Sequence, residues 1–386
     1  MKTKLIRTST VPESLYSLLK GQLQFLSQYY EIIGISSKGT FLDETSKRES
    51  VKVIGVDMVR GISPFNDLIS LIRLYIQFRK EKPTIVHSIT PKAGLLSMLA
   101  AKMAGVPIRM HTFTGLVFPT RTGAMQKLLI KMDQLLCWAA TNIYPEGSGV
   151  KNDLISFNIT SKPLKVLANG NVNGIDTHHF TPVQVSAEKQ ALLKHDLGIQ
   201  PNDFVFIFVG RLVGDKGINE LIEAFFKLPT PNTKLLLVGP FEPELDPLQP
   251  ETLKVIESHP NIISVGFQSD VRPYFAVSDC LVFPSYREGF PNVVMQAGAM
   301  ELPSIVTDIN GCNEIIVEGE NGTIIPVKNI EAIKTAMQKM MNNKEFYLKL
   351  KENARPMIQS RYEQSVVWNA LLEEYQMLIK EQGTRK

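Results

Sequence analysis

Short apolar runs alternate with segments of helical periodicity along this chain, and this alternation constrains the fold more than any other feature. Apolar runs bounded by turn residues are typical of buried strands, and longer segments with apolar residues three and four apart are typical of helices. Strands that alternate with helices form parallel sheets with crossover connections. We therefore predict an α/β protein.

The first half of the chain contains seven predicted strands and four long predicted helices. The strands lie near Leu5–Thr8, Glu31–Ser36, Lys52–Val56, Thr84–Ser88, Ile108–Thr112, Asn142–Tyr144 and Lys165–Leu167. The helices cover about Ser14–Tyr29, Phe65–Lys80, Ala93–Ala104 and Gly123–Ala140. Pro12 and Ser14 suit a helix start, and a hydroxyl cap is expected there.

A Gly/Asn-rich segment, 168–176, interrupts this pattern and has the chemistry of a linker. A second α/β series follows it, with strands near Phe204–Val209, Lys234–Val238, Ile262–Val265, Cys280–Phe283, Ser304–Val306 and Thr323–Ile325. A chain of 386 residues is long enough for two domains. We predict an N-terminal domain over residues 1–175 and a second domain over 176–362. The last helix, about 363–386, is expected to pack on the first domain.

The composition narrows the class of protein. The chain is 44% hydrophobic and 21% charged, so it can bury real cores. A net charge of +4 argues against general nucleic-acid binding. The three cysteines are far apart and suggest neither a disulfide framework nor a zinc site, which fits a reduced cytosol. We expect no signal peptide and no transmembrane helix.

Two loops that follow predicted strands carry charged residues beside glycines. Gly210-Arg211 and Lys216-Gly217 lie between the strand Phe204–Val209 and a helix that begins at Ile218. Arginine and lysine at such a place can converge on one anion, although two ordinary surface cations would look the same. The loop matches neither the Walker motif nor Gly-x-Gly-x-x-Gly.

The second loop runs from Pro284 through Glu288-Gly289 to a helix that is expected to start at Pro291. It brings a carboxylate, a glycine turn and a helix N-terminus to the carboxyl end of a strand. Free backbone N–H groups at a helix N-terminus suit phosphate, and a carboxylate suits sugar hydroxyls.

Gly-Arg-Leu at 210–212, Lys-Gly at 216–217 and Pro-Ser-x-x-Glu-Gly at 284–289 occur in an order that resembles the GT-B glycosyltransferases of family 4. The resemblance covers essentially all of the second domain and extends more weakly to the first. The segments around it look most like N-acetylgalactosaminyltransferases that extend lipid-linked bacterial glycans. The resemblance implies a GT-B fold, in which two Rossmann-like domains face a cleft, and a glycosyltransferase that retains anomeric configuration.

By that resemblance, Arg211 and Lys216 bind the donor diphosphate beside Gly210, and Glu288 contacts the transferred sugar. The amides of Phe290 and Asn292 would complete that contact. Position 296 would meet the nucleotide ribose, but it is glutamine where the family has a second glutamate. Phe267 and Gln268 lie where the family's backbone reads the base.

Three residues of the first domain are candidates for the sugar and acceptor side. His111 ends the apolar strand that begins near Val106, and the resemblance places such a histidine at the leaving phosphate or sugar. His87, also at a strand end, fits the acceptor side more loosely; a satisfied core histidine is the competing interpretation for both. Lys92 stands near a helix start, where the helix dipole disfavours a cation, so an anionic ligand would explain it.

The segment from Phe65 to Leu135 holds ten Lys/Arg and three Asp/Glu, so the first domain is locally basic. Its helix Gly123–Ala140 combines apolar residues with Lys127 and Lys131 and could lie on anionic lipid, although a core-packing helix is the simpler interpretation. No Asp-x-Asp occurs, so no metal and no other cofactor is expected. The predicted partners are a UDP-sugar donor, a saccharide or polyprenyl-diphosphate-linked acceptor, and an anionic membrane surface, but no nucleic acid.

The predicted function is transfer of a hexose or N-acetylhexosamine to a lipid-diphosphate-linked saccharide, in the synthesis of capsule or another bacterial surface polysaccharide. The predicted location is cytoplasmic, peripheral to the inner face of the plasma membrane. Two alternatives stay open: a GT-B-like UDP-sugar 2-epimerase, and a non-catalytic subunit that binds a nucleotide sugar.

Overall fold

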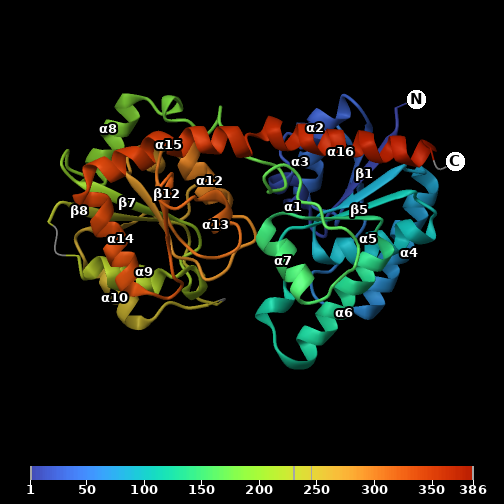
Figure 1. Cartoon of the computed structure of the whole chain (residues 1–386), viewed down its shortest axis with the longest axis horizontal. Coiled ribbons are helices and arrows are strands. Elements are labelled where there is room, and N and C mark those ends of the chain that lie inside the picture. The colour runs from blue at the N-terminus through green and yellow to red at the C-terminus, as the bar shows by residue number, and fades with distance from the viewer. Residues whose placement is uncertain (1, 229–230, 245, 385–386) are drawn as a thin grey trace. The chain divides into compact units, whose positions relative to one another are not determined.

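The computed structural model describes residues 2–228, 231–244 and 246–384, and these form two compact α/β units (Figure 1). The first unit comprises Met1–Gly174 together with Gln364–Lys386, and the second comprises Ile175–Glu363. The chain therefore leaves the first unit after Gly174 and returns to it at Gln364.

The first unit contains a parallel six-stranded sheet in the order β3-β2-β1-β4-β5-β6. Its strands are β1 (Lys4–Thr8), β2 (Glu31–Ser36), β3 (Lys52–Gly55), β4 (Ile85–Ser88), β5 (Ile108–Phe113) and β6 (Asn142–Pro145). Its helices are α1 (Pro12–Leu18), α2 (Gln22–Ser27), α3 (Thr40–Glu49), α4 (Pro64–Glu81), α5 (Pro91–Met103), α6 (Gly123–Ala139), α7 (Ser148–Ser156) and α16 (Gln364–Thr384).

The second unit repeats this topology with the order β12-β11-β10-β7-β8-β9. Its strands are β7 (Phe204–Val209), β8 (Thr233–Val238), β9 (Ile262–Ser264), β10 (Cys280–Phe283), β11 (Ser304–Thr307) and β12 (Gly322–Ile325). Its helices are α8 (Ala187–Asp196), α9 (Ile218–Phe226), α10 (Pro250–Ser258), α11 (Arg272–Ala276), α12 (Asn292–Ala299), α13 (Cys312–Ile315), α14 (Ile330–Asn342) and α15 (Lys344–Tyr362).

The strand order decides where a ligand can bind in each unit. Both sheets have the doubly wound order in which the first and fourth strands are neighbours, and the connections leave this pair in opposite directions. Ligands of open parallel sheets bind outside the carboxyl ends of the strands at such a switch point. The switch points are β1/β4 in the first unit and β7/β10 in the second.

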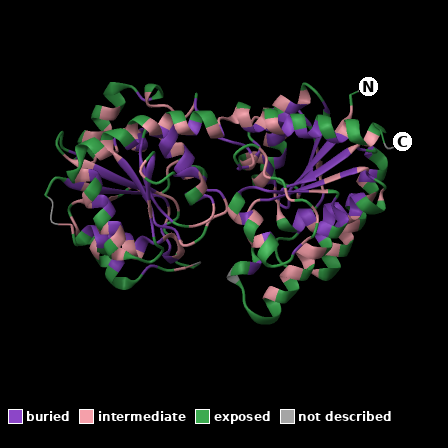
Figure 2. Ribbon diagram, viewed as in Figure 1, coloured by how far each residue is buried: buried purple, intermediate pink, exposed green. Residues whose placement is uncertain are grey.

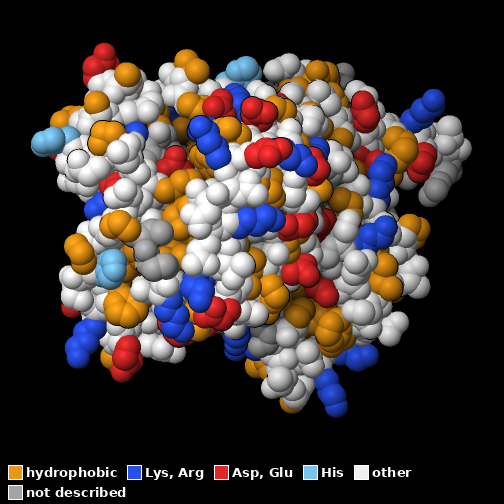
Figure 3. Space-filling model, turned by 60° about the vertical axis from the view of Figure 1, so that its left-hand side comes forward, with side chains coloured by type: hydrophobic (Ala, Val, Ile, Leu, Met, Phe, Trp, Pro, Cys, Tyr) orange, Lys and Arg blue, Asp and Glu red, His pale blue; other side chains and the backbone are white. Residues whose placement is uncertain are grey.

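Apolar side chains fill both faces of each sheet, and the buried residues concentrate on the strands and on the helix faces turned toward them (Figure 2). In the first unit, α4, α5 and α6 cover the face that carries Val86 and Phe113. The helices α1, α2 and α16 cover the opposite face, where Leu371 and Tyr375 of α16 are buried. The outer surface mixes Lys/Arg with Asp/Glu on the face seen in Figure 3, as expected for a small net charge.

Three local predictions were wrong. The helix expected over Ser14–Tyr29 is two helices, because Gly21 between them has a positive φ and a Cβ there would overlap Trp368. The start of α1 is capped by no side chain, since its N-cap residue is Val11. The strand expected at Lys165–Leu167 is absent; Leu164, just before it, forms an isolated bridge with Ile143 at the sheet edge.

Candidate functional site

The loops after β7 and β10 lie against each other at the switch point of the second unit. Gly217 ends the first loop with φ 71°, and a Cβ there would overlap the backbone oxygen of Pro284 in the second loop. Gly239, after β8, is equally tight against the backbone oxygen of Gly210. Glycine at these two positions therefore allows three strand-end loops to approach one another closely.

Lys216 and Glu288 join the two loops by a part-buried ion pair. The Lys216 ammonium donates a hydrogen bond to Glu288 Oε1, and the two side chains are only 14% and 17% exposed. Ser285 Oγ donates to the same carboxylate oxygen over 2.9 Å. The Glu288 carboxylate is thus held at the carboxyl ends of two adjacent strands, with a cation beside it.

Arg211 lies on the same loop as Lys216 but has a different partner. Its Nη1 donates to Glu242 Oε2 over 3.1 Å, and its side chain is more exposed than that of Lys216. The two cations are therefore brought to one strand end without sharing an anion in this structure. Both can bind an added anion if it replaces Glu242 and competes with Glu288.

Thr307 of β11 and Gly311 after it support the loop that follows β10. Thr307 Oγ1 donates to the backbone oxygen of Ser285 over 2.5 Å, which ties this loop to β11. Gly311 packs so closely on the backbone at Gly289 and Phe290 that a Cβ would overlap it. Sequence reasoning missed Ser285, Thr307 and Gly311 as supports of Glu288, although Ser285 is part of the motif.

The other residues predicted to bind the UDP-sugar donor lie near these loops and differ in how far they are exposed. Phe290 is buried, with its ring 5.5 Å from that of Tyr362, so only its backbone is available to a ligand. Asn292 is the exposed first residue of α12, and Gln296 follows on the same helix, half-buried. The predicted helix start at Pro291 is one residue early, because Pro291 is the N-cap.

Phe267 and Gln268 follow β9. The Phe267 ring is 74% exposed, which leaves a free apolar face beyond the strand end. Gln268 instead turns back, and its Nε2 donates to the backbone oxygen of Val265 over 2.8 Å. A ligand at this place would meet the Phe267 ring and the backbone.

His111 lies buried at the carboxyl end of β5, and its contact with the leaving phosphate or sugar stays a prediction. Its side chain is 1% exposed and packs against α5 so tightly that a Cβ on Gly94 would overlap the ring. Ser88 Oγ lies 2.8 Å from Nδ1, and burial lowers the pKa of His111 to about 3. The neutral ring is part of the core, because His111 shares the α5-facing side of β5 with Phe113.

His87 lies on the opposite face of the sheet, in a buried polar cluster. Its two ring nitrogens are each 2.7 Å from a hydroxyl, those of Tyr375 and Thr112. The Tyr375 hydroxyl also accepts a 3.0 Å hydrogen bond from Arg7. Burial, followed by the charge of Arg7, lowers the pKa of His87 well below its usual value. Both ring nitrogens have internal partners, which favours the competing interpretation of His87 as a satisfied core histidine.

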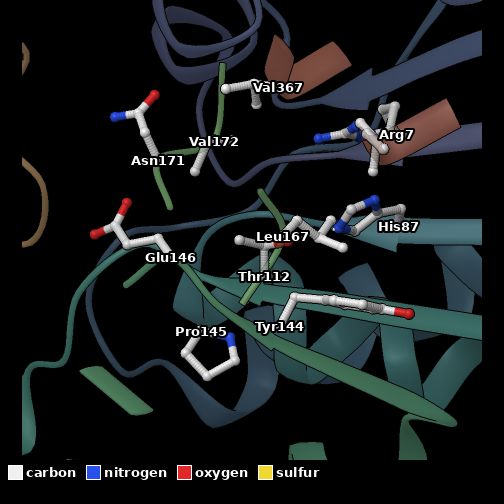
Figure 4. A pocket seen from close by; sticks show the side chains of 11 residues that line it. Arg7, His87, Thr112, Tyr144, Pro145, Glu146, Leu167, Asn171, Val172 and Val367 are labelled. Carbon is white, nitrogen blue, oxygen red and sulfur yellow. Dashed lines mark hydrogen bonds between the residues drawn. The ribbon is translucent and has the colours of Figure 1, made fainter. Parts of the chain in front are cut away.

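Figure 4 shows the cavity beside this cluster, which lies between strand residues such as Arg7 and Tyr144 and the side chain of Val367 from α16. Its volume is about 20 Å³. A cavity of that size holds about one water molecule and no sugar. The cluster therefore belongs to the packing of α16 on the sheet.

Lys92 is also engaged inside the protein. Its ammonium contacts both carboxylate oxygens of Asp67 at 2.7 and 2.9 Å and also the backbone oxygen of Gly61. The anion that the sequence argument assigned to a ligand is therefore Asp67 of α4. Lys92 holds the loop before α4 against the start of α5.

Neither a metal cluster nor a membrane span appears among the residues that the structure describes. No group of three or more His, Cys, Asp or Glu side chains in the described part is arranged to hold a metal ion. Within the same residues, no helix is both long and apolar enough to cross a bilayer. Cys137, Cys280 and Cys312 are buried and unpaired by disulfides.

Comparison with known proteins agrees with this arrangement. Residues 189–357 match the family described as glycosyl transferases group 1, and residues 13–146 match the family described as glycosyl transferase 4-like. The capsular polysaccharide biosynthesis glycosyltransferase CapM of Staphylococcus aureus is 32% identical over 382 residues, covering 98% of both chains. The UDP-Gal:α-D-GlcNAc-diphosphoundecaprenol α-1,3-galactosyltransferase of Escherichia coli is 28% identical and covers 74% of both chains.

Solved structures extend the likeness to the fold. HepE of Anabaena, determined in complex with UDP and glucose, is 16% identical and superimposes with a TM-score of 0.79, over 97% of this chain and 99% of HepE. This confirms the predicted GT-B fold. With a 32% identical relative over nearly its full length, the chain belongs to the group 1 family of glycosyltransferases.

Proposed function

We propose that this glycosyltransferase uses a UDP-sugar donor, with a hexose or N-acetylhexosamine as the transferred group, and that the donor binds at the β7/β10 switch point. The observation that carries the proposal is the part-buried pair of Lys216 and Glu288, with Arg211 at the same strand end. Two cations that suit a diphosphate thus lie beside a carboxylate that suits sugar hydroxyls. The named activity of the Escherichia coli relative and the UDP bound to HepE support the choice of UDP.

Each part of the UDP-sugar would have a protein group to bind it at this site. The diphosphate would displace Glu242 from Arg211 and draw the Lys216 ammonium toward itself, which frees Glu288 to accept hydrogen bonds from the sugar. The backbone N–H groups at the start of α12, near Phe290 and Asn292, would meet the phosphate. The base would lie against Phe267 and the backbone at Gln268, and Gln296 would hydrogen-bond the ribose without the charge of a glutamate.

For the chemistry we propose transfer with retention, in which acceptor and leaving group share one face of the sugar. The bond from the anomeric carbon to the diphosphate oxygen breaks, and a bond from that carbon to the acceptor oxygen forms. The acceptor hydroxyl proton passes to the departing diphosphate. Arg211, Lys216 and the helix N-terminus would stabilise the negative charge of the leaving group, a role that a metal ion fills in other enzymes.

The acceptor that we propose is a lipid-diphosphate-linked saccharide, in the synthesis of capsule or a related surface polysaccharide. The names of the CapM and Escherichia coli relatives support this choice. The exposed apolar side chains on two helices of the first unit support contact with a lipid surface. They are Phe65, Leu68, Ile72 and Ile76 of α4 and Met125, Leu128, Leu135 and Trp138 of α6.

These helices also carry exposed cations, such as Lys127 and Lys131 of α6. Apolar and cationic side chains on one surface suit an anionic bilayer. We therefore propose a peripheral position on the cytoplasmic face of the plasma membrane. Sequence reasoning identified α6 for this role but missed the stripe on α4.

A donor screen by UDP release tests the proposal. UDP-hexoses and UDP-N-acetylhexosamines are each incubated with the protein, with and without a diphosphate-linked saccharide, in EDTA or in Mn²⁺. We expect acceptor-dependent UDP release that EDTA does not abolish. Interconversion of the UDP-sugar without UDP release would instead identify an epimerase, and UDP binding without any turnover would identify a binding subunit.

A further inference from the structure

A second cavity lies entirely within the first unit, away from the loops described above. The loop at 60–62, the start of α5, the segment after β5 and the side of α6 enclose it. Its volume is about 420 Å³, within the range of small-molecule sites. The walls are mostly apolar, with side chains that include Ile62, Leu95, Leu116, Met125, Leu129 and Met132.

Two arginines line this apolar cavity without an internal partner. Arg60 and Arg121 are both exposed, and neither guanidinium makes a hydrogen bond or an ion pair within the described part of the chain. Lys92 lines the same cavity but is engaged with Asp67. That ion pair and the contact of Lys92 with Gly61 hold the Arg60 loop at the cavity, so the position of Arg60 is built into the fold.

Two unpaired arginines and apolar walls together favour a ligand that has both a phosphate and a hydrocarbon chain. Two free guanidinium groups favour phosphate, which they can bind through pairs of parallel hydrogen bonds. The apolar walls favour a hydrocarbon chain and give a sugar few partners. Asp133, in the α6 wall, is half-buried and has no hydrogen-bond partner among the described residues. Burial raises the pKa of Asp133 to about 7, so near neutral pH its protonated form can donate to a phosphate oxygen.

Exposed apolar side chains continue from the cavity along one face of α4. Phe65 and Leu68, on the first turns of α4 after Ile62, are 75% and 54% exposed. Ile72 and Ile76 extend the same helical face with spacings of four residues. A chain longer than the cavity could therefore leave it along α4 toward a bilayer.

We propose that this cavity binds the phosphate-proximal part of a prenyl diphosphate lipid, with the phosphates on Arg60 and Arg121 and the first isoprenoid carbons between Ile62, Leu129 and Met132. The inference rests on the proposed function, because it assigns the carrier of the acceptor to a place in the first unit. The cavity would then fix which sugar of a growing carrier-linked chain reaches the donor site.

Calorimetry with farnesyl diphosphate, a water-soluble short prenyl diphosphate, tests this site in the full chain. Saturating UDP is present so that the donor site does not contribute. We expect farnesyl diphosphate to bind at least tenfold more tightly than inorganic pyrophosphate. The double variant Arg60→Ala/Arg121→Ala should weaken farnesyl diphosphate at least tenfold, since hydrogen bonds to charged groups are lost. Arg79→Ala removes an exposed arginine of α4 outside the cavity and should change nothing.

Ile62→Asp checks the apolar wall at an exposed loop position, where folding should tolerate a charge. It should weaken farnesyl diphosphate more than pyrophosphate, because the added charge repels both probes and the polar wall disfavours the prenyl chain alone. Equal affinity for the two probes, or no effect of the double arginine variant, would overturn the proposal. So would a dimer in sedimentation that Ile62→Asp dissociates, because a second copy of the chain would then cover this face.

The outcome separates this site from the proposed function. If UDP binds and acceptor-dependent UDP release is normal while the arginine variants leave farnesyl diphosphate affinity unchanged, only the cavity assignment fails. If no UDP-sugar is bound or turned over, the proposed function fails. The farnesyl diphosphate titration without UDP then still tests the cavity by itself.

Discussion

The Lys216 ammonium donates a hydrogen bond to Glu288 Oε1, and this contact joins the loop after β7 to the loop after β10. The pair is part-buried. Ser285 Oγ donates to the Glu288 carboxylate, and Thr307 Oγ1 donates to the backbone oxygen of Ser285. A charge pair at a strand-end switch point is thus available to a ligand that can separate it.

Glu288→Gln should lower turnover by about 100-fold or more, while UDP affinity changes by less than about fivefold. The amide keeps the shape of the side chain but loses the ionised acceptor for sugar hydroxyls, a loss comparable to removal of one preorganised electrostatic group. Steady-state UDP release and UDP calorimetry measure the two effects. Turnover within twofold of wild type would remove Glu288 from the reacting site.

Arg211→Ala should weaken UDP by about 1.5–3 kcal/mol, the range for hydrogen bonds to a charged group. The matched variant Glu242→Gln removes the internal competitor of Arg211, whose Nη1 lies 3.1 Å from it, and should strengthen UDP binding slightly. Calorimetry on both variants tests the pairing. A loss of UDP affinity in Glu242→Gln would mean that Glu242 orients Arg211 for the ligand.

Gln296→Glu should leave turnover similar to wild type or improve donor affinity. The half-buried position on α12 keeps hydrogen-bonding capacity in both variants, and glutamate adds an ionised acceptor for a ribose hydroxyl. Donor KM and kcat from UDP release provide the measurement. If the substitution abolishes activity, glutamine has a role of its own at this position.

The full chain should sediment with phosphatidylglycerol vesicles, and salt should release it. Lys127→Glu/Lys131→Glu should weaken this binding, because each basic residue near an anionic surface contributes about 1 kcal/mol and screening acts within about 8 Å. Lys189→Glu/Lys254→Glu makes the same charge change on exposed residues of the second unit and serves as the control. Equal loss in both pairs would show a net-charge effect instead of a binding surface on α6.

Asp133→Asn should stabilise the protein at pH 8 more than at pH 4. Burial raises the pKa of Asp133 from 3.8 to about 7, so ionisation disfavours the folded state increasingly from about pH 4 to pH 7 and at a constant level above it. At about 1.4 kcal/mol per pKa unit, the gain at pH 8 has an upper bound of about 4 kcal/mol. Thermal unfolding of both proteins at pH 4 and pH 8 measures the difference, and an equal shift at both values would contradict a perturbed Asp133.

The local pattern of the sequence determined the element types and the fold family. Phe204–Val209 and Cys280–Phe283 are strands as predicted, because buried parallel strands are continuous apolar runs, and Gly210 and Pro284 follow them directly. The motifs after these two strands also indicated the glycosyltransferase family, since their spacing is a property of short chain segments.

Contacts between distant segments were decided only by the tertiary structure. His87 and His111 follow similar apolar runs, yet their neighbours come from elsewhere: Tyr375 of α16 bonds one ring, and Gly94 of α5 packs on the other. Lys92 pairs with Asp67, and Arg211 and Lys216 pair with two different carboxylates. The sequence does not show these partners, because they depend on which opposite charges the fold places within reach of a long side chain. The cavity beside Arg60 and Arg121 is likewise built from four separate segments, and a periodic pattern carries no information about the space between them.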